Sequence, residues 1–157
     1  MDHRDEIKDL AMTVNDGLTV YIAIHNAIFR DAATFKSFMK NLFGWGVPMS
    51  KLLEDSEGLL PLWETIHQKM EVFRQSAYSS LSKDEKHYFD ILSRYVAAVR
   101  KTVAALVDRQ RLMNQRSKGG TMTWEAFQQK EMAYQMAVQE YLSIGQELNA
   151  ATPIIFG

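Results

Sequence analysis

The first third of the chain spaces its inward-type side chains by four and three residues without a break, and this spacing constrains the fold most. The series starts at Ile7 and ends at Leu42. Such a spacing keeps one side of a helix against a partner, and about five heptads of it form a coiled-coil seam. A long packed helix is therefore predicted. Its seam consists of Ile7, Ala11, Val14, Leu18, Tyr21, His25, Ile28, Ala32, Phe35, Met39 and Leu42.

Helix-ending signals divide the rest of the chain into further helices. Proline occurs only at positions 48, 61 and 153, and no alternating strand pattern is bounded by turn residues. The stretch "GWGVP" ends the first helix, "SKDE" at 82–85 is a capping box, Thr123 is an N-cap residue and Pro153 is a helix stop. We predict helices over about 3–43, 48–80 with a kink near 58–61, 83–117 and 124–150.

These helices predict an all-α fold in which long antiparallel helices form a coiled-coil-like bundle with up-down topology. If the second and third helices are one bent rod the bundle has three helices, and otherwise it has four. Two more seams are expected to face the core. They are Leu59, Trp63, Ile66, Met70, Phe73 and Ala77, and then Phe127, Tyr134, Val138, Tyr141 and Leu148.

Size and composition exclude several classes of protein. The 157 residues suit one domain, 1–157, and the absence of cysteine excludes disulfides, iron–sulfur clusters and thiol catalysis. The 18 Lys and Arg nearly balance the 19 Asp and Glu, so the total charge does not indicate a class of binding partner. No window approaches the roughly 18 apolar residues of a membrane span, and the charged N-terminus does not resemble a signal peptide. A cytoplasmic location, with peripheral attachment to a membrane as an option, is expected.

Two histidines are candidate ligands. Glu64 and His67 have the Glu-x-x-His spacing of bundle metal sites, but at ~100° per residue both fall on the flank of the second helix, outside its seam. A solvated flank is the preferred interpretation, and neither a metal nor another cofactor is expected. His25 lies on the first seam itself, where a core histidine with one hydrogen-bond partner is favoured over haem ligation.

Charge is distributed unevenly along the chain. Between Asp90 and Lys118 seven basic residues face two aspartates, a net of +5, which leaves −6 for the rest. Arg100, Arg111 and Lys118 project along one line of the helix, and Arg94 and Lys101 along another. An anionic lipid surface would bind such a helix, whereas the alternative is a solvated helix paired with acidic neighbours. The candidate membrane-binding residues are Arg100, Lys101, Arg109, Arg111, Arg116 and Lys118.

Three stretches of the chain share features with a known family of long-helix proteins. They are "FMKNLFGWGVPMSKLLEDSEGLLPLWETIHQKMEVF", "FDILSRYVAAVRKTVAALVDRQRLMNQ" and "AVQEYLSIGQELNAATPIIF". The matching residues are Leu62, Trp63, His67, Gln68 and Lys69, then Val107, Asp108 and Arg109, then Leu148 and Pro153. Together these stretches resemble the BAR domains of amphiphysins and sorting nexins, over roughly residues 35–156.

The resemblance implies a non-enzymatic scaffold that dimerises into a curved rod and binds anionic membrane peripherally. It places Arg100, Lys101, Arg109 and Arg111 on the long helix, and Arg116 and Lys118 in the tip loop. The chain departs from the family because it stops just after the proline element and its tip loop is short, so the dimer is in question. Aromatic residues are not interleaved with the basic ones, which argues against nucleic acid. A four-helix ligand-binding or sensory module and a helical adaptor for a protein partner are the alternatives.

Overall fold

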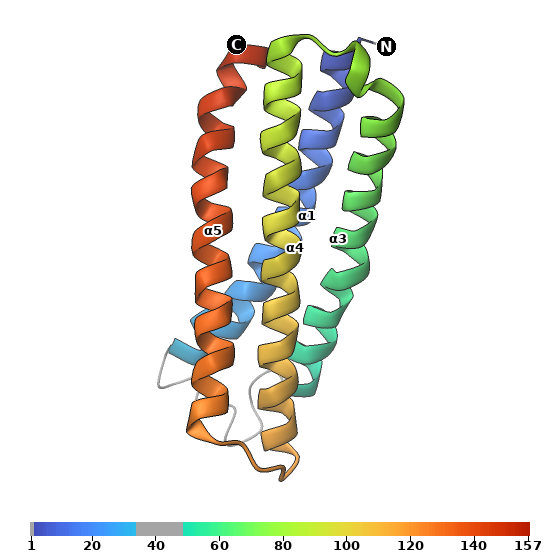
Figure 1. Ribbon diagram of the computed structural model, residues 1–157. Helices are drawn as coiled ribbons and strands as arrows, with labels where there is room; N and C mark the ends of the chain where they lie inside the picture. The colour runs from blue at the N-terminus through green and yellow to red at the C-terminus, as the bar shows by residue number, and fades with distance from the viewer. Residues whose placement is uncertain (1, 34–48) are drawn as a thin grey trace.

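The computed structural model describes residues 2–33 and 49–157, and this part of the chain contains four long helices (Figure 1). The helices are α1 (His3–Ala33), α3 (Met49–Ala77), α4 (Lys83–Ser117) and α5 (Trp124–Phe156), with a 3-10 turn, η1 (Tyr78–Ser80), after α3. No strand occurs in these ranges, and the predicted all-α class is confirmed. The predicted end of the first helix at 43, its seam residues Phe35, Met39 and Leu42, and the "GWGVP" turn lie outside the described residues.

The helix is interrupted between Ala77 and Lys83, so α3 and α4 are separate and the described residues form four long helices and not three. After η1 the capping box forms as predicted: the Ser82 hydroxyl accepts from the Glu85 backbone N–H, and the Glu85 carboxylate accepts from the Ser82 backbone N–H at 2.7 Å. Hydrogen bonding from the side chain and the backbone N–H of Ser82 to its carboxylate holds the pKa of Glu85 below its usual value. Figure 1 shows the chain reversing its direction here and again between α4 and α5.

The two internal prolines do not end the helices that contain them. Helix α3 is continuous through Gly58 and Pro61, and Pro61 lies on the exposed side, where water can bind the carbonyl group that loses its N–H partner. The prediction that the last helix stops at about 150 is wrong, because α5 continues through Pro153 to Phe156. The backbone N–H of Gly157 donates to the Pro153 carbonyl at 3.0 Å and closes this last turn.

Most residues of the predicted seams that the structure describes lie in the core or pack against it. On α1, Ile7, Val14, Tyr21 and Ile28 are buried, and all six predicted seam residues of α3 are buried. Helix α4 contributes the largest share of buried residues, because it lies between α3 and α5 and packs along both (Figure 1). One hydrophobic cluster includes side chains from all four helices.

Helix α1 crosses the others obliquely behind α4 (Figure 1). Its first half packs on α3, where Gly17 lies against the side chains of Trp63 and Ile66. Its second half reaches α5, where the Tyr21 ring packs edge-on against Tyr141 at 5.8 Å between centroids. Glycine at position 17 permits this close crossing, because Trp63 and Ile66 occupy the space that a larger side chain would need.

Gly17 and Gly58 make a matched pair for testing this crossing. A Cβ at Gly17 would lie 2.5 Å from Ile66 Cδ1 and 3.3 Å from the Trp63 ring, whereas a Cβ at Gly58 meets nothing within 4 Å. We expect Gly17→Leu to lower the free energy of unfolding in urea by about 1–3 kcal/mol through overpacking. Gly58→Leu should raise it by roughly 0.5–1 kcal/mol, since glycine weakens a helix interior. A Gly17→Leu protein as stable as the wild type would contradict the close crossing.

Candidate functional site

The six basic residues predicted to bind membrane separate into two groups. Four lie along the body of α4, whereas Arg116 is in its last turn and Lys118 is its C-cap residue. Each of the four forms an ion pair with a glutamate on a neighbouring helix, as the alternative of acidic neighbours anticipated. The pairs are Arg100–Glu64, Lys101–Glu140 at 2.9 Å, Arg109–Glu131 and Arg111–Glu57 at 3.1 Å.

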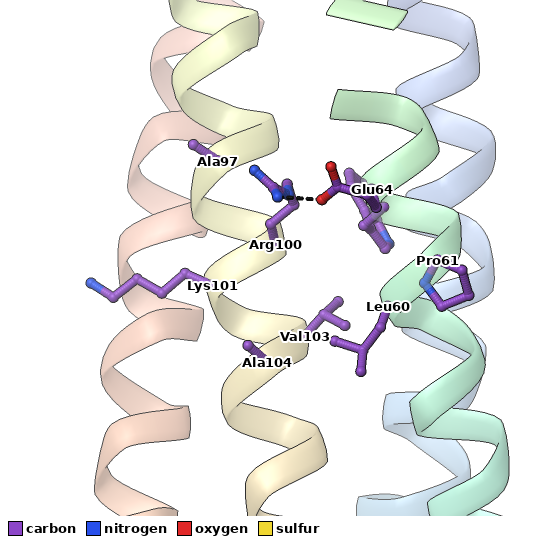
Figure 2. Close-up of a pocket in the computed structure, with 9 residues that line it drawn as sticks. Leu60, Pro61, Glu64, Ala97, Arg100, Lys101, Val103 and Ala104 are labelled. Carbon is purple, nitrogen blue, oxygen red and sulfur yellow. Dashed lines mark hydrogen bonds and ion pairs between the residues drawn. The ribbon is translucent and has the colours of Figure 1, made fainter. Parts of the chain in front are cut away.

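These pairs form two rows, one on each side of α4. Arg100 and Arg111 reach α3, and Figure 2 shows Arg100 extended to Glu64 of α3 while Lys101 points away from α3. Lys101 and Arg94 reach α5 through Glu140 and Glu147. Apart from Lys118, the two predicted lines of basic residues therefore correspond to the two interfaces of α4, and the charges of Arg94, Arg100, Lys101 and Arg111 are compensated within the bundle.

Arg109 is the most enclosed of these cations, with a side chain only 11% exposed. Its guanidinium lies 4.7 Å from the centroid of the Phe29 ring and 5.6 Å from that of Phe127, so it is in cation–π range of both. Burial acts to raise the pKa of Glu131, but hydrogen bonds from Arg109 and Gln135 outweigh burial and lower it. Arg109 therefore belongs to the interior junction of α1, α4 and α5.

The connection between α4 and α5 forms one end of the bundle and carries the remaining basic residues. Arg116 and Lys118 form no ion pair with any residue of the described ranges. Gly119, with φ 86°, ends α4, and the Thr123 hydroxyl accepts from the Ala126 N–H at 3.1 Å to start α5. The first residue of α5, Trp124, is 70% exposed. We call Arg116, Lys118 and Trp124 the tip.

The Glu-x-x-His pair lies beside an open cleft between α3 and α4. This cleft has a volume of about 610 Å³, and its lining includes Leu60, Pro61, Ala97 and the Glu64–Arg100 pair (Figure 2). His67 lines a second hollow farther along the same interface. Glu64 and His67 are half-buried, and Glu64 is engaged by Arg100. Among the described residues no group of three or more His, Cys, Asp or Glu is placed to hold a metal ion.

His25 has the predicted hydrogen-bond partner, but it is half-buried at the edge of the core and not enclosed within it. Its Nδ1 lies 2.5 Å from the Tyr134 hydroxyl, which in turn lies 2.6 Å from the Tyr21 hydroxyl. The Tyr134 hydroxyl has one proton and two lone pairs, so it can donate to one of these neighbours and accept from the other. The Phe29 ring covers the imidazole at 4.6 Å between centroids. The network joins α1 to α5 beside Arg109.

Burial sets the protonation states in this network. It lowers the pKa of His25, and the positive charge of Arg109 lowers it further. Burial also raises the pKa values of Tyr21 and Tyr134. All three groups are therefore neutral near pH 7, which suits a satisfied polar contact inside a bundle.

The oblique course of α1 leaves a cleft of about 370 Å³ between its first half and the second half of α5. Leu92 and Tyr95 of α4 line it, and Asn15 of α1 and Asn149 of α5 contribute amide groups, with Thr152 beside Asn149. Within residues 2–33 and 49–157, no charged side chain lines it. The cleft can accommodate a neutral molecule with hydrogen-bonding groups.

Comparisons with protein-family models, with curated proteins and with solved structures give no match to this chain. The resemblance to BAR domains therefore stays a prediction. In the described part of the chain no helix combines the length and the apolar character needed to cross a membrane.

Sequence reasoning missed two features of these sites. The exposure of Trp124 follows from its position as the first helical residue after Thr123, where the chain turns at the end of the bundle. Its position directly after the predicted cap residue, Thr123, could have indicated that it lies at an end of the bundle. The link between His25 and Tyr134 joins residues that are distant in the chain, and helix periodicity does not determine which seams meet.

We expect the His25 network to make folding stability depend on pH. Because the folded pKa of His25 is lowered from 6.5, the unfolded chain binds more protons below that pH, and stability falls as the pH decreases toward the folded pKa. His25→Gln removes the titration and should flatten the slope of unfolding free energy between pH 7.5 and 5.5. Urea unfolding at several pH values measures this slope, and an unchanged slope in the variant would refute the assignment.

Proposed function

We propose that this chain is a non-enzymatic helical scaffold that binds anionic membrane surfaces peripherally through the tip, from the cytoplasmic side. The observation that carries the proposal is the combination of Arg116 and Lys118 with the exposed indole of Trp124 at one end of the bundle. Tryptophan favours the interfacial region of a bilayer, and each basic residue near an anionic leaflet contributes about 1 kcal/mol.

The distribution of ion pairs supports the tip over the body of α4 as the contact surface. A cation that already binds a glutamate brings little net charge to a lipid headgroup. If the pair has to break, the lost ion pair offsets part of the free energy gained by binding the lipid. Arg100, Lys101 and Arg111 are in this situation, and Arg109 is also enclosed. Of the six predicted basic residues, the proposed contact surface therefore includes only Arg116 and Lys118.

Sedimentation with vesicles of phosphatidylserine and phosphatidylcholine tests the tip. We expect Arg116→Gln with Lys118→Gln to weaken binding by roughly tenfold to thirtyfold, since the two charges contribute about 2 kcal/mol. Trp124→Ser should weaken it further, and 0.5 M salt should weaken binding of the wild type.

The control variant combines Lys101→Gln with Arg111→Gln and changes the net charge by the same amount, but at paired positions. Its binding should fall much less than that of the tip variant. An equal loss in both variants, or wild-type binding that does not distinguish acidic from neutral vesicles, would reject the tip as the contact.

A ligand-binding module is a second candidate, and the cleft between α1 and α5 favours it. Its amide and hydroxyl groups suit a neutral ligand that is part apolar, and its position between helices is usual for ligand sites in bundles.

The neutral dye Nile red serves as a probe of this cleft. We expect its fluorescence to rise with wild-type protein, and Asn149→Trp, which fills the cleft mouth from an exposed position, should suppress that rise. Gln128→Trp places the same side chain at another exposed position of α5, outside the cleft lining, and should leave the signal intact. Equal signals from the two variants would argue against the cleft.

A further inference from the structure

The floor of the cleft between α1 and α5 holds a tyrosine hydroxyl without a partner. Tyr95 of α4 lines this cleft and is only 6% exposed. The hydroxyl groups of Tyr21, Tyr78 and Tyr134 are hydrogen bonded to other side chains, but that of Tyr95 forms no hydrogen bond within the described part of the chain. Its oxygen is not sealed in the core, unlike the unpartnered indole nitrogen of Trp63. Since buried polar groups are nearly always hydrogen bonded, this hydroxyl points to a group that enters the cleft.

The ring of Tyr95 is held in place by α5. A Cβ at Gly145 would lie 3.1 Å from Tyr95 Cε2, so the ring packs directly against the α5 backbone at this point. One turn earlier in α5, the Tyr141 ring packs against it edge-on, with 6.1 Å between the centroids. The hydroxyl is therefore fixed before a ligand arrives, and a preorganised group loses little entropy on binding.

The Tyr95 hydroxyl is a hydrogen-bond donor at neutral pH. Burial raises the pKa of Tyr95 to about 12, with a further contribution from the nearby Tyr141, so the hydroxyl keeps its proton. A phenol donates more readily than it accepts, because its oxygen lone pair is delocalised into the ring. The described lining of the cleft contains no charged side chain that could compensate a charged ligand. A neutral acceptor, such as the carbonyl oxygen of a ketone or an amide, therefore suits the inner end of the cleft.

The rest of the lining divides the cleft into an apolar middle and a polar mouth. At the mouth, the exposed side chains of Asn15 and Asn149 can donate to or accept from the outer edge of a ligand. The volume of about 370 Å³ is near the lower end of the range for ligand pockets, so the ligand is small. The apolar walls are Val14, Leu18, Leu92 and Leu148.

We infer that the cleft between α1 and α5 binds a small neutral carbonyl compound, whose carbonyl oxygen accepts from the Tyr95 hydroxyl while its apolar body lies between the two helices. The inference rests on the second candidate function, ligand binding in this cleft, and it names the chemical class of the ligand and the residue that selects it. An apolar ligand without an acceptor would leave the hydroxyl unpaired, so the site should discriminate against such a ligand.

A ketone and the matching hydrocarbon test the role of Tyr95. Acetylnaphthalene and ethylnaphthalene, substituted at the same ring position, have nearly the same shape, and displacement of Nile red gives their inhibition constants. Tyr95→Phe should weaken binding of the ketone by roughly threefold to tenfold, the net effect of one hydrogen bond, and should not weaken binding of the hydrocarbon. Tyr78→Phe makes the same chemical change outside the cleft lining and should alter neither constant.

Urea unfolding without a ligand gives a second readout. Tyr95→Phe removes a hydroxyl without a partner and should leave the urea midpoint unchanged or raise it. Tyr78→Phe removes a hydroxyl that donates to Asp90 at 2.7 Å and should lower the midpoint.

The outcomes separate this inference from the function on which it rests. If Tyr95→Phe changes ketone and hydrocarbon binding equally, or changes neither, the inference is overturned and the cleft is an unselective apolar site. A lower urea midpoint for Tyr95→Phe would show that the hydroxyl already has a partner in the protein, and would overturn the inference as well. If Nile red does not bind the wild type, the ligand-binding function fails and the inference fails with it.

Discussion

Helix α4 has to bury apolar side chains on two sides at once, and the positions of the other helices follow from this requirement. Phe89, Leu92, Val96, Val99 and Val103 are among its buried residues, and they form the wall on which α3 and α5 pack. Burial of such side chains contributes about 1.5–3 kcal/mol each, whereas an exposed ion pair contributes 0–1 kcal/mol. Hydrophobic packing therefore holds the bundle together, and the two rows of ion pairs help to determine which helix lies on which side.

Helix α1 packs on the layer formed by α3, α4 and α5 by crossing it obliquely (Figure 1). Gly17 lets α1 approach α3 closely, and farther along the chain Tyr21 and His25 meet the aromatic side chains of α5. Buried hydroxyl and imidazole groups are costly without partners, so the hydrogen bonds to Tyr134 restrict where this crossing can occur. The same oblique course leaves the cleft at the opposite end of the α1–α5 interface. The polar network and the cleft are thus two results of one crossing angle.

Much of the fold could be predicted from the sequence because its signals are local. The seam of α3, the capping box at Ser82 and the cap at Thr123 each depend on residues within one or two helical turns, and all three are confirmed. The end of α5 was predicted too early, since a proline in a last turn removes one hydrogen bond and does not by itself stop the helix. Which glutamate binds Arg100 or Lys101 depends on how helices are arranged around α4, and no single-helix pattern contains that information.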